Sequence, residues 1–222
     1  MENRIKDIIT DVETLSSWSV EIDTRKESKL MQEIILALKE TMRANNLVSL
    51  AAPQIGYNKR ILCLRFGEKD YRTFINPMIE NNTSLTMSRE KCSSIPDKEF
   101  VIPRFAKIKF YFTTPMGKVE ACSLAGMAAI RLQHAIDHLN GMLISDIGLE
   151  IDELFDQATD EEREEVLRMY AESLDIRQQE LDKIIEKDEE LKEVNDAIKF
   201  MQSVKDGTTT VEFVKDKEAK DK

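Results

Sequence analysis

Apolar positions at helical spacing mark two predicted helices. In residues 27–45 they step by three and four along the chain, so one face of the helix is apolar. Residues 126–139 form a second, largely apolar helix that ends at Asn140–Gly141, a common stop signal. The apolar positions of the first helix are Leu30, Met31, Ile34, Ile35, Leu38 and Met42.

Strand-like runs, some continuous and some alternating, lie between the two helices. The predicted strands are residues 60–66, 71–76, 105–114 and 119–124. Residues 77–104 show little periodicity and contain Pro77, Pro96 and Pro103, so we predict mostly loop there, with short extended pieces. Strands followed by helices that pack on them predict an α+β fold.

The pattern changes in the last third of the chain. Thr159 and Glu162 form a capping-box signature, and apolar residues then recur mainly at steps of three and four. Polar residues interrupt this seam, so a long amphipathic helix is predicted rather than a regular coiled coil. We expect three parts: a folded domain at 1–157, the long helix at 158–206, and a short strand with a disordered charged tail at 207–222.

Charge is unevenly distributed over the 222 residues. The chain has a net charge of −10, and residues 159–206 carry −8 of it. Such acidity argues against nucleic-acid binding, which needs clustered Lys and Arg. No apolar run is long enough to span a bilayer, and the N-terminus lacks a signal-peptide core. Because the three cysteines are scattered, we expect a reducing, cytoplasmic setting, or assembly into an intracellular or viral complex, without membrane contact.

The two histidines of the chain, His134 and His138, lie four residues apart in the second helix. Both imidazoles therefore project from one helix face, as two ligands of one metal ion do. Two unrelated polar histidines on a solvated helix are the alternative, but the apolar surroundings favour a specific partner. Cys92 is the candidate third ligand because its surroundings are loop-like, whereas Cys63 and Cys122 lie in strand-like runs typical of inert packing. One thiolate, two imidazoles and an open position outline a hydrolytic metal site.

These residues fall within three motifs. Residues 47–54 read LVSLAAPQ, residues 90–94 read EKCSS and residues 133–138 read QHAIDH. They follow the chain order of the GxGxAAxQ, EGCxS and QHExDH motifs of the peptide deformylases. Over residues 25–148 the chain therefore resembles that family, and the resemblance implies mixed or antiparallel sheets around a central helix that carries the two histidines.

The resemblance also implies a chemistry. Cys92, His134 and His138 match the family's ligands for a divalent metal, which is iron(II), or nickel, cobalt or zinc in its place. Such enzymes remove formate from N-formylmethionyl peptides. Gln54 matches a glutamine that stabilises the tetrahedral intermediate, and the backbone N–H of Ser93 would be the other donor. For Gln54, an amide that only ties down its loop is an equal alternative.

Ala135 is the departure from the family pattern with the largest consequence. The resemblance puts a glutamate at this position, which takes a proton from the attacking water and passes it to the leaving amine. A methyl group does neither, and positioned acid–base catalysis is typically worth about 10²–10⁴-fold. Asp137 lies about 200° around the helix from Ala135 and is expected to face away from that position. Glu90 is expected to support the site from behind the ligands.

Three further departures lie in the first two motifs. Leu47, Ser49 and Lys91 stand where the family has glycines, so their side chains are expected to crowd the pocket, and Lys91 adds a cation. Changes spread over two motifs and position 135 favour a naturally degenerate relative over a single engineered substitution.

Two functions are open. In the first, the chain is a catalytically impaired, deformylase-like structural or assembly module, with or without metal, whose helix at 159–206 binds a protein partner or a second copy. In the second, it is an active deformylase acting on formylmethionyl peptides, with Ala135 an engineered or compensated substitution. A different metal hydrolase on the same fold is a third alternative.

Overall fold

The computed structural model describes residues 4–151, 155, 157–170 and 172. In chain order its elements are α1 (Val12–Leu15), α2 (Ser28–Ala44), β1 (Ser49–Ala51), the 3₁₀ turn η1 (Ala52–Ile55), β2 (Ile61–Arg65), β3 (Tyr71–Cys92), β4 (Ile95–Thr113), β5 (Val119–Ala125), α3 (Met127–Leu139), α4 (Ile144–Ile147) and β6 (Leu149–Glu150). Residues 160–170 and 172 are also helical. The chain divides into two compact units, residues 1–163 and 164–222.

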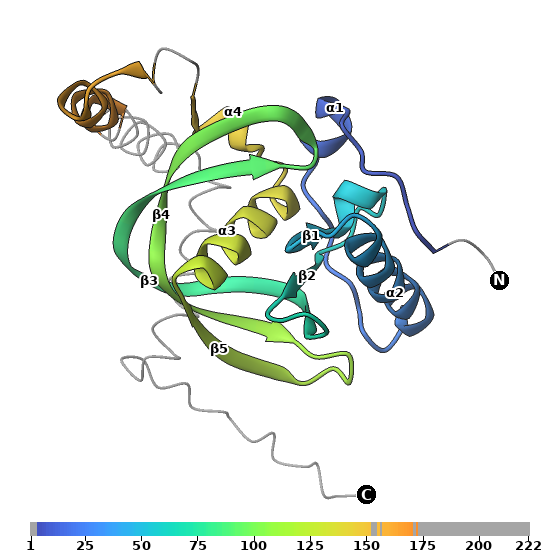
Figure 1. Cartoon of the computed structure of the whole chain (residues 1–222). Helices are drawn as coiled ribbons and strands as arrows, with labels where there is room; N and C mark the ends of the chain where they lie inside the picture. The colour runs from blue at the N-terminus through green and yellow to red at the C-terminus, as the bar shows by residue number, and fades with distance from the viewer. Residues whose placement is uncertain (1–3, 152–154, 156, 171, 173–222) are drawn as a thin grey trace, which may run out of the picture. The chain divides into compact units, whose positions relative to one another are not determined.

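The strands form one antiparallel sheet in the order β1-β2-β3-β4-β5, with β6 paired to β4. Figure 1 shows β3 and β4 as a long hairpin that curves around α3, while α2 lies beside β1 and β2. An antiparallel sheet packed with helices is an α+β fold, so the predicted class is confirmed.

Strand β2 is buried on both of its faces. Ile61 and Cys63 belong to a core formed with α2, whereas Leu62 and Leu64 belong to a second core formed with α3. Because successive side chains of a strand point to opposite faces, one short strand serves both cores. This double burial explains why residues 61–64 are continuously apolar rather than alternating.

Both predicted helices are confirmed. Helix α2 buries the apolar face that its spacing predicts, including Met31, Ile34 and Leu38. Helix α3 ends at the cap Asn140, and Gly141 follows with a φ of 68°, a left-handed conformation that glycine adopts without strain. Ten of its thirteen residues are buried, so α3 is the central helix of the domain.

The expectation of a mostly loop-like segment at 77–104 is wrong. Strands β3 and β4 pair along nearly the whole segment, from Met78 opposite Tyr111 to Cys92 opposite Ile95. Pro77 lies at a register shift, where an irregular ladder tolerates a residue without an N–H group. The backbone N–H and C=O groups of each strand pair with those of the other strand. This pairing by itself leaves no periodic pattern in the sequence of either strand.

The capping box at the start of the C-terminal helix is confirmed. The Thr159 hydroxyl accepts a hydrogen bond from the Glu162 N–H at 3.3 Å, and the Glu162 carboxylate accepts one from the Thr159 N–H at 2.8 Å. The remainder of the predicted helix to 206 and the tail at 207–222 lie outside the described residues apart from 160–170 and 172. Among the described helices, none is long and apolar enough to cross a bilayer.

Candidate metal centre

The structure brings Cys92, His134 and His138 together. Cys92 is the last residue of β3, not a loop residue, and the two histidines project from α3. Their candidate ligand atoms all lie within 4.8 Å of one another, and the Cys92 Sγ is 3.2 Å from the His138 Nε2. The three side chains are buried, with His134 the most exposed at 9%.

The His134 ring is oriented as in metal-binding histidines. The His134 Nδ1 lies 2.8 Å from the Glu90 carboxylate, which orients the ring and leaves its Nε2 as the remaining donor atom. The His138 Nδ1 is buried and, among the described residues, has no hydrogen-bond partner. One thiolate and two imidazoles suit zinc, iron(II), nickel or cobalt, so the residues present fit a divalent metal.

A buried network of charges supports His134. Arg104 in β4 donates from Nε to Glu90 at 2.8 Å and from Nη1 to Asp137 at 2.6 Å. Burial raises the pKa of Glu90, but hydrogen bonds from His134 and Arg104 outweigh it and hold the pKa at about 2. The supporting role predicted for Glu90 is confirmed. Asp137 is buried, and its carboxylate completes this network.

Two buried cysteines differ sharply in acidity. Burial raises the pKa of Cys63 to about 11, so this thiol stays neutral and serves as packing. Burial also raises the pKa of Cys92, but hydrogen bonds to His134 and His138 outweigh it and lower the pKa to about 5. Cys92 is therefore the thiolate that a metal requires. Cys122 is half-buried and packs at the margin of the α3 core.

Gln54 lies beside the ligand group in η1. Its Oε1 accepts a hydrogen bond from the Ala51 N–H at 2.9 Å, and its Nε2 donates to the Ser94 hydroxyl at 3.1 Å and faces the Cys92 Sγ at 3.8 Å. The side chain thus ties down its own loop and also directs an amide donor at the site. Ser93, whose N–H is the other predicted donor, is exposed immediately after Cys92.

Ala135 lies between the two histidines and is 1% exposed. Its methyl group belongs to the apolar core that α3 forms with β2 and β4. Glu90 and Asp137 are the acids that contact the ligand histidines or their partners, and both are engaged with Arg104. Both acids near the ligand group are therefore held by the same arginine.

A small pocket of about 180 Å³ opens next to His134. It is lined by Val48, Ser49, Arg89, Glu90, Lys91, Met127, Ile130, Arg131 and His134. Ser49 and Lys91 border it, as the sequence predicts. Leu47 does not, because it packs against the α2 core instead, so the expectation that it crowds the pocket is wrong.

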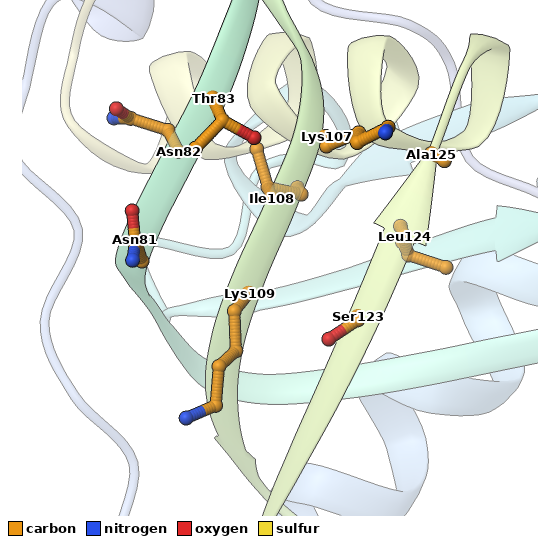
Figure 2. Close-up of a pocket in the computed structure, with 9 residues that line it drawn as sticks. All are labelled: Asn81, Asn82, Thr83, Lys107, Ile108, Lys109, Ser123, Leu124 and Ala125. Carbon is orange, nitrogen blue, oxygen red and sulfur yellow. The ribbon is translucent and has the colours of Figure 1, made fainter.

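A larger cleft, of about 350 Å³, lies on the sheet away from these residues. Figure 2 shows its polar lining from β3, Asn81 to Thr83, opposite Lys107 and Lys109 of β4 and Ser123 of β5. It shares no lining residue with the ligand group or the smaller pocket.

Arg104 is the site residue that the sequence analysis missed. It belongs to the run VIPRF, in which apolar residues surround a single charge. A cation in a buried strand needs an anionic partner, so this position is a signal of a buried ion pair. Arg104 lies in the segment that the sequence predicts to be mostly loop, and in a loop a single charge is expected to face solvent.

Comparison with known proteins places these residues in context. The family described as polypeptide deformylase matches residues 5–151. A peptide deformylase of Dictyoglomus turgidum is 31% identical over 146 residues, covering 64% of this chain and 95% of that protein. The crystal structure of the Thermotoga maritima peptide deformylase is similar with a TM-score of 0.57 at 29% identity, covering 64% of this chain and 97% of that one.

A further neighbour supports the fold alone. It is the Met-Ala-Ser-bound class I type b peptide deformylase of Acinetobacter baumannii, with a TM-score of 0.60 at 23% identity. The match covers 64% of this chain and 98% of that chain.

Proposed function

Because the chain belongs to the polypeptide deformylase family, we propose that it is a metal-binding deformylase homologue with an impaired hydrolytic step that acts as a binding or assembly module. The observation that carries the proposal is Ala135, a buried methyl group between two histidines that share a ligand group with Cys92. The site keeps the residues that bind but has lost the residue that would move a proton.

A general base works best when its pKa lies near the working pH. Glu90, held at a pKa of about 2 by His134 and Arg104, is too weak a base to take over. Asp137 accepts a hydrogen bond from the same arginine, Arg104. Neither acid therefore replaces the carboxylate that the family resemblance assigns to position 135.

The ligand group retains the capacity to bind. A divalent metal held by Cys92, His134 and His138 would supply Lewis acidity for a carbonyl or a water. Gln54 presents its amide donor at the same place, where a substrate oxygen would be held. The Met-Ala-Ser ligand in the Acinetobacter baumannii structure makes a formyl-Met-Ala-Ser peptide the natural probe.

The test is formate release from formyl-Met-Ala-Ser by the metal-loaded full chain and by its Ala135→Glu variant. We expect the unmodified chain to be slower by about 10²–10⁴-fold, since that is the usual value of a positioned acid–base group. Ala135→Gln is the matched control, because it adds nearly the same volume without a carboxylate and should stay slow.

The intact ligand group also favours the second candidate, an active deformylase with a compensated substitution at Ala135. The same assay decides between the two. Substantial formate release by the unmodified chain would overturn the impaired-module proposal and support the active enzyme.

A further inference from the structure

The pocket beside His134 has an apolar wall and a cationic rim. Val48, Met127 and Ile130 supply the wall, which suits an apolar first side chain. Lys91 and Arg131 supply the rim, from the end of β3 and from α3 respectively. The two halves of the pocket therefore offer different chemistry to different parts of one ligand.

The acids near this rim are already engaged with other cations. Glu90 lines the pocket but is neutralised by Arg104 and His134. Glu99 lies opposite Lys91 in the ladder, yet its carboxylate binds Arg89 at 3.1 Å. Among the described residues, Lys91 and Arg131 make no ion pair, so the rim carries excess positive charge.

This local positive charge contrasts with the net charge of the whole chain, which is −10. A cationic rim on an acidic protein attracts anionic ligands and repels cationic ones. A free N-terminal ammonium group would meet the rim unfavourably, whereas a formylated N-terminus is neutral. The positive rim therefore disfavours peptides with a free N-terminal ammonium group. It also favours acidic over basic side chains in the residues that follow.

We propose that Lys91 and Arg131 make this site selective for formylmethionyl peptides with acidic side chains directly after the methionine. The inference rests on the proposed function, because it takes the ligand group as the place where the formylated end binds. It goes further in naming the class of peptide and the two residues that select it.

The test compares three amidated peptides, so that no terminal carboxylate competes for the rim: formyl-Met-Glu-Glu, formyl-Met-Gln-Gln and formyl-Met-Lys-Lys. Their dissociation constants for the zinc-loaded full chain are measured by calorimetry. Two exposed ion pairs of ordinary strength predict that the Glu peptide binds about three- to tenfold tighter than the isosteric Gln peptide. The Lys peptide should bind weakest, and the differences should shrink in about 0.5 M salt.

Substitutions of the two rim residues test whether these residues cause the preference. Lys91→Gln and Arg131→Gln should each lower the preference for the Glu peptide over the Gln peptide. Lys69→Gln removes an exposed lysine in the turn between β2 and β3 and should leave the preference unchanged. Equal binding of the Glu and Gln peptides, a preference that survives both rim substitutions, or no binding of any peptide would overturn the inference.

Failure of the proposed function can be told apart from failure of the selectivity of the rim. If the unmodified chain proves to be an active deformylase, the preference is measured instead as the ratio of kcat/KM for the Glu and Gln peptides. That ratio tests the rim whether or not Ala135 limits the rate.

Discussion

Glu90 shows how a single side chain links the metal ligands to the sheet. One carboxylate joins His134 of α3 to Arg104 of β4, and all three side chains are buried. Removing one member of a buried charge network leaves the others without a partner in a medium that penalises charge. The ligand geometry and the stability of the domain therefore depend on the same residue.

We predict that Glu90→Gln weakens zinc binding by about 10–100-fold, the usual cost of losing a group that orients a ligand histidine. It should also lower the free energy of unfolding by about 3 kcal/mol, because Arg104 loses one of its two anionic partners. Zinc affinity is measured by competition with a chelating dye, and stability by urea unfolding.

Glu120→Gln is the control for that substitution. Glu120 lies in β5 and pairs with Lys118 on the surface, where an ion pair contributes little. Unchanged zinc affinity in Glu90→Gln would contradict the orienting role of Glu90.

Candidate ligands could be recognised from sequence because their chemistry is local and rare. His134 and His138 share a helix face by spacing alone, and Cys92 lies in a recognisable motif. Arg104 could not be placed in the same way, since its partners come from β3 and α3 and the pairing of β3 with β4 was not predicted. Long-range ion pairs follow from the fold, not from the local pattern.

At the scale of elements, helices and short strands were predictable, but the long hairpin was not. In helix α2 and in strand β2, the apolar residues that become buried form a recognisable pattern within one continuous stretch of sequence. The part of β3 around Asn81 and Asn82 is polar and exposed, and its stability comes from the ladder with β4. This part of the hairpin carries no regular apolar alternation for a sequence pattern to reveal.

The end of α3 gives a prediction at this scale. A Cβ at Gly141 would lie 2.5 Å from the Ser16 carbonyl oxygen, and the residue has a φ of 68°. Gly141→Ala should therefore lower the free energy of unfolding by about 2–4 kcal/mol, because both the close approach and the backbone conformation disfavour a side chain. Urea unfolding measures the change.

Gly67→Ala serves as the control for the α3 terminus. A Cβ there meets only the Asp70 side chain at 3.8 Å, which is an ordinary contact. Its stability should change by less than about 0.5 kcal/mol. Equal loss in both variants would show that the contact between Gly141 and the segment at Ser16 does not matter.

At the scale of the whole molecule, the net negative charge is concentrated in the C-terminal part of the chain. Residues 159–206 hold −8 of the net −10, and the sequence predicts an apolar seam along the same stretch. A seam of this kind is stable in water only when it is covered. We propose that a second copy of the chain covers it.

The prediction is that the full chain sediments as an oligomer, whereas a chain ending at residue 163, the boundary of the first compact unit, sediments as a monomer. Raised salt should strengthen the association, because it screens the repulsion between acidic helices. Monomers in both cases would rule out self-association.

The split origin of the ligand group has a consequence for how the protein is made. The Cys92 Sγ and the His138 Nε2 meet across 46 residues of chain, and the second must arrive on a helix that already packs against the sheet. During synthesis, Cys92 therefore leaves the ribosome before His134 and His138 do. Cys92, His134 and His138 can hold one ion together only after α3 has been synthesised and has packed on the sheet, so a metal ion held by all three residues marks a folded domain.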